Sequence, residues 1–182
     1  MTTPVLSFSP ELLLRAQGVR LLILDVDGVM TDAGLYFGAG GEVLKRFHAH
    51  DGLGLRLLAG VGIHVAVITG LDSEPVRARL RALGIEHAHY GQVQKLPAAL
   101  SVLQVVGATW EQTAVMGDDW HELPLMQRCA LSCAPPNAHP EVLAAVHYTT
   151  RRRGGEGAVR ECCDLLLTAG GHYARLLHDA TA

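Results

Sequence analysis

The sequence predicts an α/β protein built on a Rossmann-like parallel sheet flanked by helices. Short apolar runs of strand length alternate with segments of helical pattern, and one such segment has Asp72 and Ser73 before it and Gly84 after it. Chains that alternate in this way form parallel sheets covered on both faces. Such sheets bind ligands beyond the carboxyl ends of their strands, so polar residues at those ends are candidates for a functional site.

The predicted elements follow one another without an internal repeat, a low-complexity tract or a linker. The expected strands are Val19–Val26, Ile63–Thr69, Ile85–Tyr90, Thr113–Met116 and Ala130–Ala134. The expected helices are Ser73–Leu83, Lys95–Val106, Glu122–Arg128 and Pro140–Ala145. At 182 residues the chain is most simply a single domain, residues 1–182, with a core of its own.

The composition argues against several classes of function. A formal net charge of −3 does not indicate a nucleic-acid surface, and the run Arg151–Arg153 is too short to change this. No apolar stretch reaches membrane-spanning length and no signal-peptide pattern opens the chain, so a cytoplasmic protein without membrane contact is expected. The cysteines include the adjacent pair Cys162 and Cys163, and free thiols are expected. The histidines lack the partners of a zinc site.

An insertion follows the first strand. Residues Gly34–Phe47 hold two short β-prone segments on either side of the glycine-rich stretch Gly38–Gly41, a pattern typical of a β-hairpin. The hairpin carries Leu35, Phe37 and Val43, whose apolar side chains need a partner surface if the hairpin projects from the sheet.

Two carboxylates stand where the first strand is expected to end. Asp25 and Asp27 follow a run of apolar residues, and the two-residue period of a strand directs their side chains broadly the same way. Like charges this close raise each other's pKa unless a cation holds them, and Mg²⁺, which takes hard oxygen ligands, is the natural candidate. A turn or a helix cap explains an Asp-Gly sequence equally well, so this pair alone leaves both interpretations open.

Polar residues after other strands favour the metal site. They are the acids Asp118 and Asp119, the pair Thr69 and Gly70, and Lys95 at the start of a helix. Parallel strands end on one edge, so Asp118 can meet Asp25 across one cation, with Asp119 supporting the ligands from behind. The Thr-Gly pair offers a hydroxyl and an unhindered N–H to an oxyanion. A lysine at a helix start is disfavoured by the helix dipole, which favours a functional reason for it.

Together these residues predict a site for phosphoryl transfer. Hydrolysis of a phosphate ester needs a nucleophile, a proton donor for the leaving oxygen and positive charge around the phosphate. Asp25 would attack phosphorus to form an aspartyl-phosphate, and Asp27 would protonate the leaving alkoxide and then activate water. Mg²⁺ would be held by Asp25, Asp118 and the backbone carbonyl of Asp27. The phosphate would be bound by Thr69, Gly70 and Lys95.

Four stretches, "DVDGVMTD", "VITG", "GQVQK" and "GDDWHELPLM", resemble the motifs of the haloacid dehalogenase-type phosphatases. Their spacing, the hairpin, "HDGLGLRLL" (His50–Leu58) and "GGEGAVRECCDLLL" (Gly154–Leu167) are similar to one branch, the 3-deoxy-D-manno-octulosonate 8-phosphate phosphatases. The similarity covers about residues 19–168, with a C-terminal helical tail after it. It implies a haloacid dehalogenase-like fold with no cap domain.

The resemblance also implies an activity and an assembly. The implied reaction is magnesium-dependent hydrolysis of 3-deoxy-D-manno-octulosonate 8-phosphate to 3-deoxy-D-manno-octulosonate and phosphate, in lipopolysaccharide biosynthesis. The implied assembly is a homotetramer in which a neighbour's tail and hairpins enclose the site. The residues at positions where the family contacts its substrate are His48, His50, Asp51, Gly52, Arg56 and Arg79.

Three positions depart from the family pattern and leave alternatives open. Leu71, His50 and Glu156 stand where the family has arginine, and each loses a cation that could meet the substrate. A phosphatase for another acidic sugar phosphate, such as a nonulosonate 9-phosphate, therefore stays open. A phospho-signalling receiver also clusters Asp, Thr and Lys, although its phosphorylated Asp lies on a later strand. A non-catalytic homologue is the last alternative, and the intact Asp25 and Asp27 speak against it.

Overall fold

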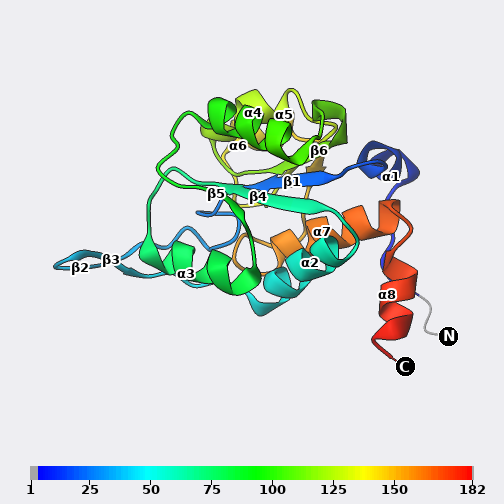
Figure 1. The fold of residues 1–182 in the computed structure, drawn as a ribbon, viewed down its shortest axis with the longest axis horizontal. Coiled ribbons are helices and arrows are strands. Elements are labelled where there is room, and N and C mark those ends of the chain that lie inside the picture. Colours follow the sequence, from blue (N-terminus) through cyan, green and yellow to red (C-terminus); the bar gives the residue numbers. More distant parts are fainter. Residues whose placement is uncertain (1–3, 182) are drawn as a thin grey trace.

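A six-stranded parallel sheet runs through the middle of the computed structural model, which describes residues 4–181 (Figure 1). Its strands are β1 (Leu21–Leu24), β4 (His64–Ile68), β5 (His87–His89), β6 (Thr113–Met116), β7 (Leu131–Ala134) and β8 (Tyr148–Thr149). They lie in the order β5-β4-β1-β6-β7-β8, and each neighbouring pair is parallel. The five predicted strands are confirmed. The two residues of β8 are too few to give a pattern in the sequence.

Helices cover both faces of the sheet, as the alternating pattern predicts (Figure 1). One face is covered by α2 (Ala49–Gly60), α3 (Glu74–Leu83) and α7 (Ala158–Ala169), and the other by α4 (Lys95–Val106), α5 (Leu123–Met126) and α6 (Pro140–Ala145). The remaining helices are α1 (Pro10–Ala16), α8 (Tyr173–Asp179) and the 3₁₀ turns η1 (Trp110–Gln112) and η2 (Trp120–Glu122). The helix expected over Glu122–Arg128 is therefore shorter than predicted, and η2 precedes it.

Two hydrophobic cores lie on opposite sides of the sheet because successive strand residues point to opposite faces. In β1, Leu22 and Leu24 enter the core shared with α2 and α7, whereas Leu21 and Ile23 enter the core shared with α4 and α5. All four side chains are buried. A strand covered on both faces has no solvated side, and the charged residues Asp25 and Asp27 come only after β1 has ended.

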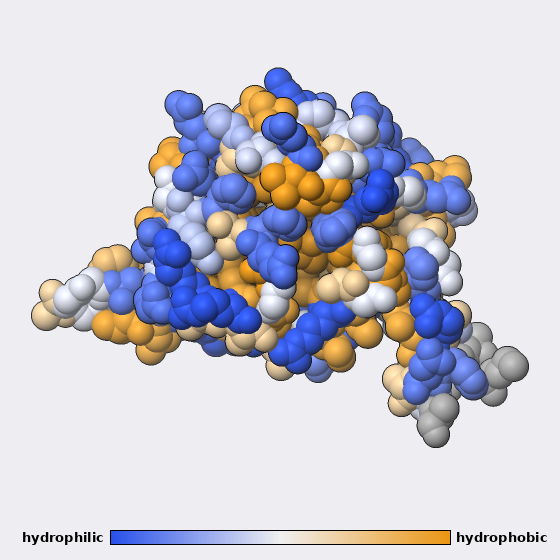
Figure 2. Space-filling model, in the orientation of Figure 1, coloured by the Kyte–Doolittle hydropathy of each residue, from blue (hydrophilic) through white to orange (hydrophobic). Residues whose placement is uncertain are grey.

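The insertion after β1 is an antiparallel hairpin, as predicted, formed by β2 (Tyr36–Gly38) and β3 (Gly41–Leu44). It projects from one end of the molecule, and apolar surface gathers on it (Figures 1 and 2). Phe37 and Val43 are 67% and 58% exposed. The hairpin is the only inserted structure between β1 and α2 in the described chain, so the fold has no cap domain.

Two further features bear on the class of protein. Within residues 4–181, no helix combines the length and the apolar character needed to cross a membrane. The four cysteines, Cys129, Cys133, Cys162 and Cys163, are buried and free.

Candidate active site

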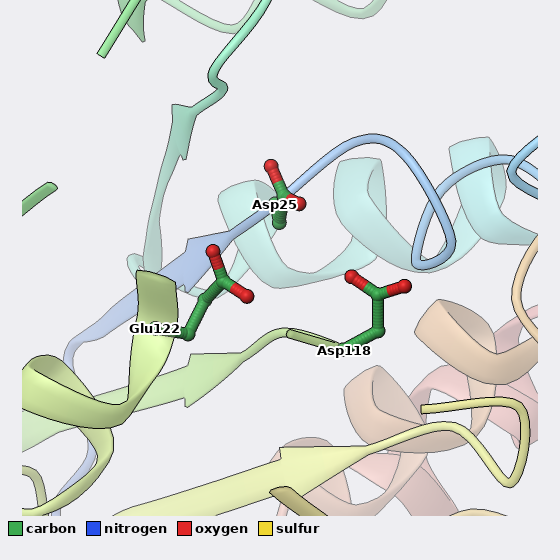
Figure 3. A group of neighbouring side chains, drawn as sticks. All are labelled: Asp25, Asp118 and Glu122. Carbon is green, nitrogen blue, oxygen red and sulfur yellow. The ribbon is translucent and has the colours of Figure 1, made fainter. Parts of the chain in front are cut away.

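Three acidic side chains meet at the carboxyl ends of β1 and β6 (Figure 3). Asp25 follows β1 directly, Asp118 follows β6 after one glycine, and Glu122 closes η2. One oxygen of each carboxylate lies within 4.8 Å of the others. The backbone N–H of Asp25 donates to the carbonyl of Met116 at 3.0 Å, which extends the pairing of the two strands past their ends. The predicted meeting of Asp25 and Asp118 is therefore present.

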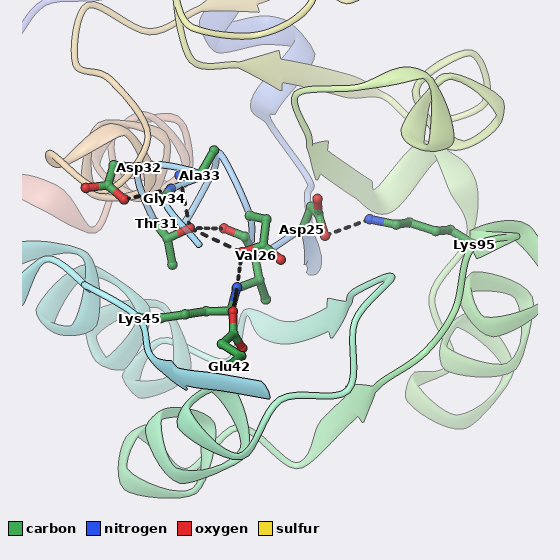
Figure 4. Close-up of polar contacts among 10 residues, drawn as sticks. Asp25, Val26, Thr31, Asp32, Ala33, Gly34, Glu42, Lys45 and Lys95 are labelled. Carbon is green, nitrogen blue, oxygen red and sulfur yellow. Dashed lines mark hydrogen bonds and ion pairs between the residues drawn. The ribbon is translucent and has the colours of Figure 1, made fainter. Parts of the chain in front are cut away.

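Lys95 lies between two of these carboxylates. It is the first residue of α4 and is only 4% exposed. Its Nζ lies 2.7 Å from Oδ1 of Asp25 (Figure 4) and 2.5 Å from Oε1 of Glu122. Burial lowers the pKa of Lys95, but the two carboxylates outweigh it, so the pKa is raised and the ammonium stays charged. The unfavourable start of the helix is offset by these ion pairs.

The carboxylates carry more negative charge than one lysine neutralises. Burial raises the pKa of Asp25 to about 6, with Lys95 opposing the rise and Glu122 adding to it. Burial also raises the pKa of Asp118 to about 8, and the nearby Asp25 and Glu122 add to that rise. Groups that resist ionisation in this way become fully ionised when a further cation lies among them.

The loop after Asp27 is shaped to admit Asp118. Gly28 has a φ of +81°, and a Cβ added there would lie 1.8 Å from Oδ2 of Asp118. The Asn137 amide holds the loop, because its Nδ2 donates to the Gly28 carbonyl at 2.9 Å and its Oδ1 accepts from the Gly154 N–H at 2.8 Å. Only glycine at position 28 lets the acid of β6 approach this closely.

Asp27 does not share the partners of Asp25. β1 ends at Leu24 and Asp27 lies in the following turn, so the two-residue period expected for the two acids does not continue to it. Lys45, at the end of the hairpin, places Nζ 2.5 Å from Oδ1 of Asp27. The same Nζ lies 2.7 Å from Oε1 of Glu42 (Figure 4). Burial lowers the pKa of Lys45, but the two acids raise it more, so the ammonium stays charged.

The predicted phosphate-binding pair lies at the same edge of the sheet. Thr69 and Gly70 follow β4, which is the neighbour of β1. The N–H of Thr69 donates to His89 and its carbonyl accepts from Gln92, each at 2.9 Å, so the backbone here is held on both sides. A Cβ added at Gly70 would meet no atom within 4 Å, and the next residue, Leu71, is 45% exposed.

Two of the predicted sugar-binding residues line a cavity beside this edge. The cavity has a volume of about 480 Å³ and lies between residues 5–8, the start of α2 and the start of α7. His48 and His50 line it with their rings edge to face, 5.0 Å apart, and Glu156 also lines it. None of the three clustered carboxylates lines the cavity. The histidines are therefore placed beside the carboxylate site rather than in it.

Asp51, another residue expected to bind substrate, is occupied by the fold. It is 3% exposed, and its Oδ1 accepts the backbone N–H of Arg160 in the first turn of α7 at 2.8 Å. Burial raises the pKa of Asp51. The Asp51 side chain links the start of α2 to the start of α7. It therefore stabilises the side of the cavity that His48 and His50 line.

Arg79 and Arg56 differ in what they reach. The Nη2 atom of Arg79 donates to the His48 carbonyl at 3.4 Å, and a Cβ at Gly52 would lie 2.5 Å from it, so the glycine admits the guanidinium. Arg56 donates to the carbonyl of Ala82 at 3.0 Å, near the end of α3. That end of α3 leads into β5 at the amino edge of the sheet, so the structure does not bring Arg56 to the carboxylates.

Asp119 and Glu122 form a reciprocal cap around η2. Oδ1 of Asp119 accepts the N–H of Trp120 at 2.8 Å, and Oε2 of Glu122 accepts the N–H of Asp119 at 3.0 Å. Asp119 thus holds the turn that carries Glu122. Glu122 and Lys45 were not among the site residues predicted from the sequence. The three-residue spacing of Asp119 and Glu122 is that of a capping box, and this spacing could have revealed Glu122. No local pattern in the sequence marks Lys45.

Known proteins match both the sequence and the fold. Residues 88–160 match the model of the haloacid dehalogenase-like hydrolases. The chain is 44% identical over 163 residues to the 3-deoxy-D-manno-octulosonate 8-phosphate phosphatase of Salmonella typhimurium, covering 90% of this chain and 87% of that one. The chain belongs to the 3-deoxy-D-manno-octulosonate 8-phosphate phosphatase family.

Solved structures of this phosphatase family share the fold described above. The enzyme from Yersinia pestis superposes with a TM-score of 0.88 at 44% identity, over 91% of this chain and 89% of that one. The enzyme from Moraxella catarrhalis, solved in complex with magnesium, phosphate and KDO, has a TM-score of 0.89 at 34% identity, over 93% of this chain and 97% of that one. The predicted family and fold are confirmed.

Proposed function

We propose that this protein is a magnesium-dependent phosphatase that hydrolyses 3-deoxy-D-manno-octulosonate 8-phosphate through an aspartyl-phosphate. The observation that carries the proposal is the position of Asp25 at the end of β1, with Lys95 at 2.7 Å and Asp118 close by. A carboxylate nucleophile, a buried cation and a second acid on one sheet edge are what phosphoryl transfer requires. The family membership supports the same reaction.

Asp25 and Asp27 divide the chemistry between them. A carboxylate oxygen of Asp25 forms a bond to phosphorus as the bond from phosphorus to the ester oxygen breaks, and Asp27 gives its proton to that leaving oxygen. Asp27 then takes a proton from water, whose oxygen attacks phosphorus. The bond from phosphorus to Asp25 breaks, inorganic phosphate leaves, and both carboxyl groups return to their starting states.

The acidic cluster fits Mg²⁺. Its three carboxylates and one ammonium leave two negative charges, which match a divalent ion, and all the donors are hard oxygens. Both oxygens of Glu122 are engaged, one by Lys95 and one by the Asp119 N–H, so we assign the metal to Asp25 and Asp118. When bound, the ion neutralises charge on the phosphate oxygens and on the attacking carboxylate.

Asp27 is assigned to the metal through its backbone carbonyl rather than its side chain. Oδ1 of Asp27 is engaged by Lys45. Among the described residues, none donates a hydrogen bond to the Asp27 carbonyl, which leaves that oxygen available as a ligand.

Thr69, Gly70 and Lys95 are assigned to the phosphate. Thr69 and Gly70 directly follow β4, the strand beside β1, and the Lys95 ammonium is already held at the nucleophile. His48 and His50, which line the cavity beside this edge, are assigned to the sugar. The start of α2, which carries these histidines, is held in place by contacts of Asp51 and Arg79 and by the space that Gly52 leaves for Arg79.

A second candidate substrate is another acidic sugar phosphate, such as a nonulosonate 9-phosphate. The observation that favours it is the side chain of Leu71, which is 45% exposed at the end of β4 where the resemblance expects arginine. A missing guanidinium removes a bidentate partner for the substrate carboxylate.

The decisive experiment measures phosphate release from a panel of esters with and without Mg²⁺. We expect the octulosonate ester to give the highest kcat/KM, EDTA to abolish turnover, and added Mg²⁺ to restore it. Higher kcat/KM for the nonulosonate ester would move the assignment to the second candidate. Undiminished turnover in EDTA would remove the metal from the proposal. Glucose 6-phosphate, which has no carboxylate, is the matched control.

We also propose a homotetramer located in the cytoplasm. The support for assembly is the hairpin, where Leu35, Phe37 and Val43 are each more than half exposed and apolar. Light scattering should give a mass near four chains, and Phe37→Ser with Val43→Ser should lower it. An unchanged mass in that variant would exclude the hairpin from the interface. Fractionation of cells expressing the full chain tests the location.

A further inference from the structure

Lys45 directly follows β3 and is a cation with a fully buried side chain. Its side chain is 0% exposed, although β2, the first strand of the hairpin, is exposed along its length. The ammonium lies 2.5 Å from Oδ1 of Asp27 and 2.7 Å from Oε1 of Glu42. A lysine is buried in this way only when its charge is paired. The pairing residue is Asp27, which the proposed function assigns to proton transfer.

We propose that Lys45 is a positioning residue that fixes Oδ1 of Asp27, so that Oδ2 exchanges the proton with the leaving-group oxygen. This inference rests on the proposed function and adds to it the means by which the acid–base carboxyl is oriented.

The contacts of Asp27 carry the inference. Oδ1 receives a short, charge-assisted contact from Lys45 and a much weaker one from Thr31 Oγ1 at 3.5 Å. Among the described residues, none donates to Oδ2, and 26% of the Asp27 side chain is open to solvent. The terminal torsion of an aspartate is broad and nearly two-fold, so without an anchor the two oxygens exchange places freely.

Glu42 holds the lysine from the other side. It lies three residues before Lys45 at the end of the hairpin, and its side chain is 11% exposed. Burial raises the pKa of Glu42, but contacts with Lys45 and Ser73 outweigh it and leave the pKa lowered, so Glu42 remains a carboxylate. The Glu42 carboxylate therefore holds the ammonium in place, and the ammonium cannot follow Asp27 if that side chain rotates.

The test uses esters that differ in their need for a proton. An alkoxide leaving group requires protonation, whereas p-nitrophenolate leaves without it. In Lys45→Met, we expect the single-turnover rate at which the leaving group departs to fall roughly tenfold or more for the octulosonate ester, and by less than about threefold for p-nitrophenyl phosphate. Asp27→Asn supplies the reference for complete loss of proton transfer.

Arg46→Met is the matched control. Arg46 is the neighbouring cation, is half exposed, and pairs with Asp32 at 2.9 Å without contact to Asp27. This variant should leave the ratio of the two leaving-group departure rates unchanged. Lys45→Gln keeps a hydrogen-bond donor and replaces Lys45→Met in the test if that variant does not fold. We expect it too to lower the rate for the octulosonate ester relative to that for p-nitrophenyl phosphate.

Two results overturn the inference in distinguishable ways. Equal loss of the leaving-group departure rate on both esters in the Lys45 variants shows that Lys45 only supports the hairpin, and the proposed function then stands. A wild-type protein that hydrolyses neither ester in the presence of Mg²⁺ defeats the proposed function, and the role of Lys45 with it.

Discussion

Two buried lysines divide the candidate site into a rigid half and a projecting half. Lys95 lies between Asp25 and Glu122, and Lys45 lies between Asp27 and Glu42. Each ammonium is therefore held by one proposed catalytic acid and one supporting glutamate. The arrangement is the same, but the elements that carry it differ.

The rigid half belongs to the core. Lys95 begins a helix of 12 residues that packs on the sheet. Its partner Glu122 ends the three-residue turn η2, and the Glu122 side chain is only 3% exposed. The projecting half belongs to the hairpin, whose Phe37 and Val43 face solvent. The nucleophile is thus anchored by helix and sheet packing, whereas the acid–base carboxyl is anchored by a hairpin with little packing of its own.

We therefore expect loss of the two halves to have different effects on turnover and on the stability of the fold. The core half holds the atoms that bond to phosphorus, so its loss ends turnover and weakens the fold. The hairpin half sets a proton donor, so its loss slows turnover and leaves the fold nearly intact.

The largest expected effect is on the nucleophile. Asp25→Asn should lower kcat by at least roughly 10⁴-fold, the order that removal of a catalytic nucleophile costs. Single-turnover assays with acid quench should find no phosphate attached to the protein. Turnover within tenfold of the wild type would show that Asp25 is not the nucleophile.

Replacement of each lysine by methionine compares the halves in stability. Lys95→Met leaves two nearly buried carboxylates without their cation and should lower the free energy of unfolding by about 3–5 kcal/mol. Lys45→Met should lower it by roughly 1–2 kcal/mol, because Asp27 can be hydrated. Urea unfolding of the metal-free proteins measures both. Equal losses would contradict the division into a rigid and a projecting half.

Loss of the acid–base carboxyl should be smaller than loss of the nucleophile. Asp27→Asn keeps the shape of the side chain but removes its proton, so kcat for an alkyl ester should fall on the order of 10²-fold or more. Both half-reactions should slow, which pre-steady-state phosphate release can separate. An unaffected second half-reaction would assign activation of water to another residue.

The smallest expected effects come from the supporting glutamates. Glu122→Gln cannot accept from both the Asp119 N–H and Lys95 with its single oxygen, and it should lower the free energy of unfolding by about 1–3 kcal/mol. Glu42→Gln retains one neutral contact to Lys45 and should cost about 1 kcal/mol or less. A larger loss in Glu42→Gln, measured by urea unfolding, would show that the hairpin is anchored more firmly than its exposure indicates.

The residues of the rigid half could be predicted from the sequence more readily than those of the projecting half. Asp25, Asp118, Thr69 and Lys95 each stand at the boundary of a predicted element, and the strands that precede the first three end on one edge of a parallel sheet. Their meeting could be predicted because the rule for parallel strands needs only the order of elements. Glu122 also carried a local signal, the spacing of a capping box.

The partners of Asp27 had no such signal. Asp27 lies beyond the end of β1, so the period of the strand does not describe its direction. Lys45 lies 18 residues away on an irregular hairpin, where a buried and an exposed lysine give the same pattern. Asp51 likewise matches a family position for substrate contact, yet the fold turns it toward Arg160.

The sequence by itself determined the α/β architecture, the hairpin and the meeting of Asp25 with Asp118 at the sheet edge, because apolar periodicity and strand order reflect burial along each element. Only the tertiary structure decided which cation each acid holds. An ion pair between separate elements depends on how those elements pack and on the direction that a long side chain takes. The residues next to the pair in the sequence determine neither.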